Sequence, residues 1–195
     1  MNKITKKERP SFKTILSDAA VPTLIIPSNV VNEIRYLNSK SPSKEWSGIL
    51  FYTINEGSIN DAKNLVLEAK GILLKDIGTA GSTAYEFSAD VVEYMDKKAE
   101  ELNIEPIEIY STWKIAHHHS HCSMGVTPSG TDKEEIEDNI KNHVMYLTTI
   151  TNNSLDISAW LSVFVKVESK SVFSYIDHEF QTHSLSNNIE SDGIM

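Results

Sequence analysis

The chain has 195 residues and a formal net charge of −9, with 40% hydrophobic and 23% charged residues. These values are ordinary for a globular protein whose single domain buries a sizeable core, and the negative charge argues against binding to duplex DNA or to an anionic membrane. One cysteine excludes an internal disulfide, and no apolar stretch has the length of a signal peptide or a membrane span. We therefore expect a cytoplasmic protein with no nucleic-acid partner and no membrane partner.

The first half of the chain alternates between apolar strands and amphipathic helices. The expected elements are a strand at 21–26, a helix capped by Ser28 with Val30, Ile34 and Leu37 on its apolar face, a loop at 38–44, a strand at 46–54, a turn at 55–58, a strand at 65–74, a loop at 78–83, a helix capped by Ser88 that runs to about Leu102, and a strand at 107–116. This last strand leads directly into a run of histidines.

The second half is predicted to be richer in strands. We expect a short polar helix at 133–142, strands at 144–150, 157–167 and 172–176, and a turn at Asn152 and Asn153. Together the elements predict an α/β or α+β fold with one central mixed sheet flanked by helices. We expect a lead-in at 1–20, one domain at 21–180, and a polar, disordered tail at 181–195.

The most informative pattern is H-x-H, seven residues, and then S-x-x-D, at His119, His121, Ser129 and Asp132. Residues i and i+2 of a strand share a face, so two imidazoles would project together, and a loop would return the carboxylate to them. Two histidines and a carboxylate are a ligand set of catalytic zinc sites, which keep the fourth position open. The pattern therefore predicts a zinc site.

The S-x-x-D part of the pattern has a second interpretation. Ser129 with Asp132, and Thr131 with Glu134, both match the spacing of a helix capping box. Those residues could merely start the helix, although a helix start is also a rigid place to fix a ligand.

Hydrolysis at such a site needs a base and a donor to the oxyanion as well as a metal. Glu45, at the start of the apolar strand at 46–54, is our candidate for the general base. Ser129 is our candidate for the hydroxyl that stabilises a tetrahedral intermediate.

These motifs, with Glu45 just before a Ser-Gly-Ile-Leu run, resemble the JAMM (MPN-plus, JAB-domain) metalloprotease family over about residues 21–180, and most of all its prokaryotic and phage members. The resemblance implies the cytidine-deaminase-like MPN/JAB fold. It implies zinc held by His119, His121 and Asp132, with Glu45 as general acid/base and Ser129 steadying the intermediate. It also implies a polypeptide substrate cut at a peptide or isopeptide bond, often at the C-terminal tail of a ubiquitin-like or sulfur-carrier protein.

The chain departs from the family pattern at two positions. Cys122 replaces a proline after the second histidine, and His117 replaces a tryptophan two residues before the first, with Trp113 further back. We expect His117 to line the site, His118 to point to the other face, and Cys122 to be a buried small residue. A cysteine nucleophile at Cys122 is the alternative.

Two other functions fit the same residues. One is a non-catalytic binding or assembly module that keeps zinc for structure, for example in a phage particle, with His117 as a fourth ligand. The other is a metal hydrolase of a small, non-protein substrate. The sequence gives no oligomeric state.

Overall fold

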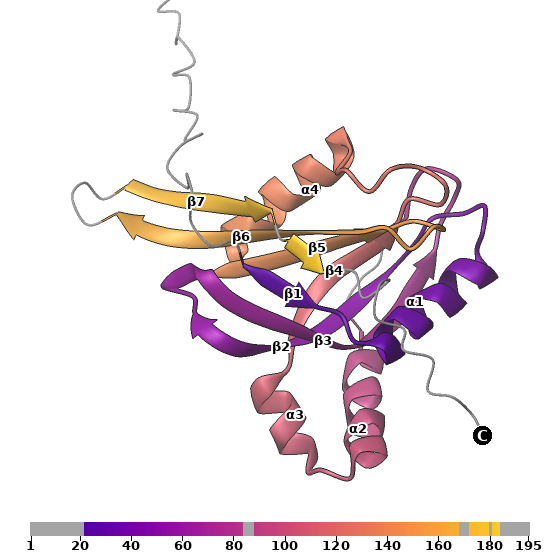
Figure 1. Cartoon of the computed structure of the whole chain (residues 1–195), viewed down its shortest axis with the longest axis horizontal. Coiled ribbons are helices and arrows are strands. Elements are labelled where there is room, and N and C mark those ends of the chain that lie inside the picture. The colour runs from indigo at the N-terminus through magenta and orange to yellow at the C-terminus, as the bar shows by residue number, and fades with distance from the viewer. Residues whose placement is uncertain (1–21, 84–87, 168–171, 180, 184–195) are drawn as a thin grey trace, which may run out of the picture.

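The computed structural model describes residues 22–83, 88–167, 172–179 and 181–183. One eight-stranded mixed sheet runs through them in the order β7-β6-β5-β4-β2-β3-β1-β8, and it curls while helices flank it (Figure 1). The predicted fold class, a mixed sheet flanked by helices in one domain, is confirmed at this level.

The elements follow one another along the chain with short connections. They are β1 (Thr23–Ile25), α1 (Ser28–Lys40), β2 (Trp46–Ser58), β3 (Asp61–Ile77), α2 (Asp90–Leu102), α3 (Pro106–Thr112), β4 (Lys114–Ser120), α4 (Gly130–Asn139), the 3-10 helix η1 (Ile140–Asn142), β5 (Met145–Thr151), β6 (Ile157–Val167), β7 (Val172–Glu179) and β8 (Gln181–His183). None of the described helices has the length and apolar character needed to cross a membrane.

The first seven residues of strand β2 are buried on both faces in the middle of the sheet. Its residues Leu50 and Tyr52 belong to the main hydrophobic cluster with side chains of α1, β1 and β3. Ile49 and Phe51 point to the opposite face and pack with side chains of α2 and α3. Because both faces are covered, the start of this strand is a continuous apolar run and not an alternating one.

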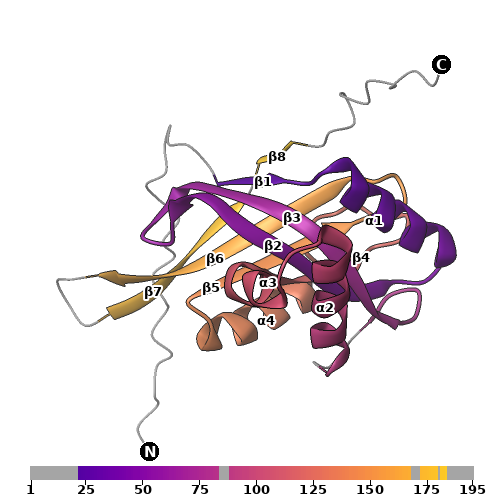
Figure 2. The same ribbon diagram turned by 90° about the horizontal axis from the view of Figure 1, so that it is seen from below.

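The register between β2 and β4 decides where the histidines point. The two strands are antiparallel, with Ser47 opposite His119 and Ile49 opposite His117. Directly opposite residues share a face. His117 and His119 therefore lie on the face that α2 and α3 cover, and Figure 2 shows α4 on this side of the sheet as well.

The strand predicted at 107–116 is wrong for most of its length. Residues 106–112 form helix α3, and the strand begins only at Lys114. Pro106 occupies the first helical turn, where its missing N–H costs nothing and its fixed φ favours a helix. Trp113, which we placed within a strand, follows this helix, and its ring packs at an angle of 49° to that of Phe51.

Several predicted boundaries also move. Residues 55–58 continue β2, and the turn falls at 59–60. Ser28 and Ser88 do not cap their helices, whose N-caps are Pro27 and Ala89, and α1 extends to Lys40 into the predicted loop. The polar helix begins at Gly130 and not at 133. Residues 181–183, assigned to the tail, form β8, whereas 1–20 and the rest of the tail lie outside the described residues.

Candidate metal centre

Three side chains from β4, the loop after it and α4 converge on one point. The Nε2 atoms of His119 and His121 are 3.0 Å apart. Each lies 3.2 Å from a different carboxylate oxygen of Asp132. Both histidines are buried, and Asp132 is partly buried. The three residues that the sequence predicted as ligands are therefore brought together.

The donor atoms have the spacing that a small divalent cation requires. With metal–nitrogen distances near 2.0–2.1 Å, neighbouring ligands in a tetrahedral site lie about 3.3 Å apart. The separations of 3.0–3.2 Å among these three side chains are close to that value. Two imidazole nitrogens and one carboxylate form a donor set that could bind a metal ion.

The ring of His121 is oriented by the loop that follows it. Strand β4 ends at Ser120, and the backbone N–H of His121 donates to the carbonyl of Thr151 at 2.8 Å. Its Nδ1 lies 2.8 Å from the carbonyl oxygen of Gly125, which can only accept. Nδ1 therefore carries the proton, and the lone pair of Nε2 faces the site, as in metal-binding histidines.

Asp132 serves two purposes at the start of α4. Its backbone N–H donates to Ser129 Oγ at 3.2 Å, while its Oδ2 accepts from the backbone N–H of Ser129 at 2.6 Å. The capping-box interpretation is thus correct and compatible with the ligand interpretation. Burial opposes ionisation of Asp132, but hydrogen bonds from His119, His121 and Ser129 hold its pKa well below the usual range.

Glu45 lies at the edge of this site. It precedes β2, and its backbone exchanges two hydrogen bonds with the loop after β3: its N–H donates to the Thr79 carbonyl at 2.7 Å, and its carbonyl accepts from Gly78 at 2.9 Å. Since Ser47 is opposite His119, Glu45 falls beside His121 on the same face. Its side chain is buried.

The surroundings of Glu45 suit proton transfer. Burial raises the pKa of Glu45, while the charges of His121 and His119 lower it and that of Asp132 raises it again. The carboxylate is thus electrostatically coupled to all three ligand candidates. A carboxylate with a raised pKa is better matched to proton exchange near neutral pH.

His117 and His118 leave the strand on opposite faces. His117 Nδ1 contacts Glu135 Oε1 at 3.2 Å, and its ring centroid is 5.3 Å from that of His119. Burial, followed by the charge of His119, lowers the pKa of His117 to about 3. His118 points to the other face, as predicted, and packs against Trp46. Its Nδ1 lies 2.7 Å from Thr149 Oγ1.

Cys122 is buried, as predicted. Its backbone adopts a left-handed conformation with φ of 49° just after the strand. Burial, followed by the charge of Glu45, raises the pKa of its thiol. A raised pKa disfavours the reactive thiolate.

The sequence interpretation missed Glu135 and Gly125. Glu135 follows Asp132 by three residues, so both project from one face of α4 toward the histidines. That spacing was available in the sequence. The role of the Gly125 carbonyl was not, because it depends on how the loop folds.

Neither protein-family models nor curated protein sequences give a match to this chain. The assignment of the site therefore rests on its own residues and their geometry.

Proposed function

We propose that the protein is a zinc-dependent peptidase or isopeptidase of the JAMM type, with the MPN/JAB fold of that family. The observation that supports this most strongly is the convergence of His119, His121 and Asp132 beside the buried carboxylate of Glu45. We also propose that its substrate is a polypeptide, with the C-terminal tail of a ubiquitin-like or sulfur-carrier protein as the substrate class.

The chain's own residues divide the chemistry between them. A zinc ion, held by the two histidines and Asp132, would supply Lewis-acid polarisation and a water of lowered pKa. Glu45 takes the proton of the attacking water and delivers it to the leaving amine, a role that its raised pKa supports. The O–H of Ser129 donates to the oxyanion, because its capping bond to Asp132 uses only a lone pair.

The composition of the converging ligand group supports an enzyme over a structural zinc protein. A structural site normally closes its fourth position with a protein ligand, and His117 was the candidate. Among the described residues, the ligand atoms that lie within 4.8 Å of one another belong to His119, His121 and Asp132, and His117 is not in this group. An open fourth position is what a catalytic zinc site requires.

A chelator and a cysteine variant separate the metal mechanism from a thiol mechanism. We expect a chelator to abolish cleavage of a ubiquitin-like protein fused to a C-terminal peptide, and added zinc to restore it. We expect Cys122→Ala to retain most of the turnover, because the thiol is protonated and lies outside the ligand group. Loss of turnover in Cys122→Ala, together with full resistance to the chelator, would contradict the proposal.

A further inference from the structure

The loop that carries His121 is fastened to the turn between β5 and β6. The backbone N–H of His121 donates to the Thr151 carbonyl at 2.8 Å, at the end of β5. Ser158 Oγ, at the start of β6, donates to the Val126 carbonyl. Between these two contacts lies the side chain of Asn152, which is buried.

All four hydrogen-bonding positions of the Asn152 amide are used. Oδ1 accepts from the backbone N–H groups of Ser154 and Asp156, each at 3.0 Å. Nδ2 donates to Asp156 Oδ2 at 2.9 Å and to the Met124 carbonyl at 3.1 Å. Two backbone donors thus identify the oxygen, which fixes the orientation of the amide and directs its N–H at Met124.

Met124 lies inside the turn that orients the metal ligand. Its backbone N–H donates to the His121 carbonyl at 2.8 Å, and the next carbonyl, that of Gly125, accepts from His121 Nδ1 at 2.8 Å. The Asn152 amide holds the Met124 carbonyl and so constrains the peptide that leads to the Gly125 carbonyl. We infer that Asn152 is a positioning residue that sets the ring orientation of His121 through Met124 and Gly125.

The same turn is also tied to the strand that follows Glu45. Asn38 Nδ2 donates to the Asn152 carbonyl at 2.8 Å, and Asn38 Oδ1 accepts from Trp46 Nε1 at 2.9 Å. Trp46 is the residue next to Glu45. One buried network therefore joins the ligand loop, the β5–β6 turn and the start of β2, and it keeps the ligand and the candidate base in register.

The inference rests on the metal centre of the proposed function and is independent of the hydrolytic step. Asn152→Asp keeps the size and the oxygen acceptor but replaces the donor that holds Met124. Asn153→Asp is the matched control: it makes the same change one residue later, where the side chain is exposed and its Nδ2 donates to the Pro42 carbonyl at 2.8 Å.

The experiment measures the zinc dissociation constant of the full chain by competition with a chromophoric chelator. We expect Asn152→Asp to weaken zinc binding by about tenfold, as for other groups that orient metal ligands, and Asn153→Asp to change it by less than about twofold. The visible spectrum of bound Co²⁺ should shift in Asn152→Asp alone. Equal zinc affinities and equal Co²⁺ spectra in the two variants would overturn the inference.

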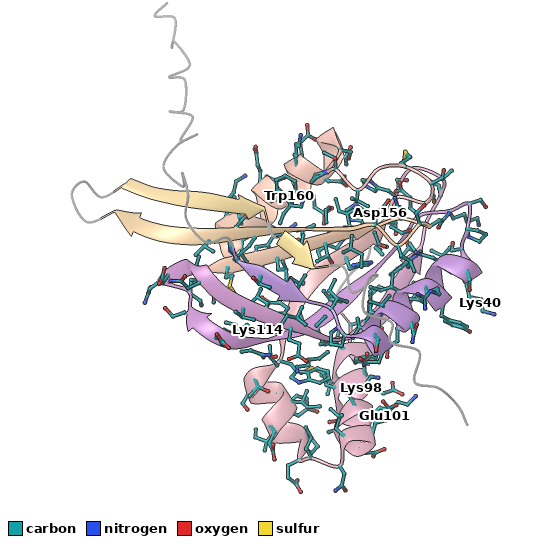
Figure 3. All side chains as sticks on the ribbon, in the orientation of Figure 1. Lys40, Lys98, Glu101, Lys114, Asp156 and Trp160 are labelled. Carbon is teal, nitrogen blue, oxygen red and sulfur yellow. The ribbon has the colours of Figure 1, made fainter. Side chains whose placement is uncertain are left out.

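Asp156 supplies a second variant if Asn152→Asp does not fold. Its side chain is exposed in the β5–β6 turn (Figure 3), so Asp156→Ala removes one bond to the Asn152 amide at the surface. We expect Asp156→Ala to bind zinc about threefold more weakly than Asn153→Asp does, because about threefold in affinity corresponds to the loss of one modest hydrogen bond. No weakening would overturn the inference.

The outcomes also separate this inference from the proposed function. Weaker zinc binding in Asn152→Asp, with no peptide cleavage by the wild-type chain, would support the inference and contradict the peptidase. A wild-type chain that binds no zinc would overturn both.

Discussion

Asp132 shows how one side chain ties local structure to chemistry. Its carboxylate accepts the N-terminal hydrogen bond of α4 and also faces two imidazoles. The capping box removes freedom from the helix start, so the carboxylate is already in place for a cation. Ser129 can likewise serve two purposes, because a lone pair of its Oγ caps the helix while its O–H remains available for donation.

Substitutions at Ser129 separate its two roles. Ser129→Ala removes the cap and should lower the free energy of unfolding by about 1 kcal/mol. It should also lower kcat by about 10²-fold, as for the loss of an oxyanion donor. Urea denaturation and steady-state kinetics measure the two effects.

Ser129→Gly is the matched control, because glycine at an N-cap costs only about a few tenths of a kcal/mol and places no side-chain donor at the site. It should keep most of the stability without restoring kcat. Full recovery of kcat in Ser129→Gly would show that Ser129 acts only as a cap.

The ligand residues could be predicted from the sequence, but the position of Glu45 could not. The spacing of His119, His121 and Asp132 is local, so strand parity and one loop are enough to bring them together. Glu45 reaches them only through the register of β2 against β4, a long-range pairing that no local pattern encodes. Its assignment depended on a family resemblance.

At the scale of elements, β2 is the strand on which the site depends. Its first residues are buried on both faces, and Gly48 lies directly against the backbone of β3. A Cβ at Gly48 would lie 2.3 Å from the Leu73 carbonyl oxygen, which is backbone and has no flexible end to yield. The close approach therefore requires glycine.

Gly48→Ala should lower the free energy of unfolding by about 1–3 kcal/mol or more, because the added methyl overpacks the β2–β3 pairing. Gly130→Ala is the control, since a Cβ there meets nothing within 4 Å and the position is helical. It should stabilise the protein by about 0.5–1 kcal/mol. Equal urea midpoints for Gly48→Ala and the wild type would contradict this account of the strand.

Helix α4 differs from the other helices that flank the sheet. It has no fully buried side chain, and its polar contacts toward the sheet include those of Asp132 with His119 and His121 and of Glu135 with His117. A bound cation would add a strong link to this otherwise weakly packed helix.

Removal of zinc should therefore loosen α4 selectively. We expect a chelator to raise amide hydrogen exchange across 130–139 while β4 and β5 stay protected, because the strands retain their ladders without the ion. His121→Ala, which lacks a ligand, should show the faster exchange with or without zinc. Unchanged exchange in α4 after zinc removal would contradict the link.

The element that the sequence patterns assigned to the wrong type, α3, is too short to show a clear helical period. The segment at 106–112 is one helix of two turns, too brief for a helical period to outweigh its apolar character, and Pro106 was the signal that should have marked its start. The strand β6, at Ile157–Val167, was predicted with correct bounds, whereas β3, at Asp61–Ile77, extends beyond both ends of the predicted strand at 65–74. Which side chains from different elements meet depends on how the strands pair in the sheet, and this pairing could not be predicted from the sequence.

At the scale of the whole molecule, the main hydrophobic core and the candidate metal centre lie on opposite faces of the curled sheet. The main hydrophobic cluster lies on the side of α1, and the candidate histidine ligands lie on the opposite face with α2, α3 and α4 (Figures 1 and 2). Glu45, the two histidines and Asp132 meet at this face because β2 and β4 are neighbours in the sheet and α4 lies on the same side (Figure 2).

The most direct test of the proposed zinc hydrolase measures metal content and turnover together in Glu45→Gln. Glu45 is beside the ligands but is not one of them. The variant should keep one zinc ion per chain and lose at least about 10²-fold of the wild-type kcat, the usual contribution of a general base. A variant that cleaves peptide at the wild-type rate, or a wild-type chain that binds no zinc, would contradict the proposal.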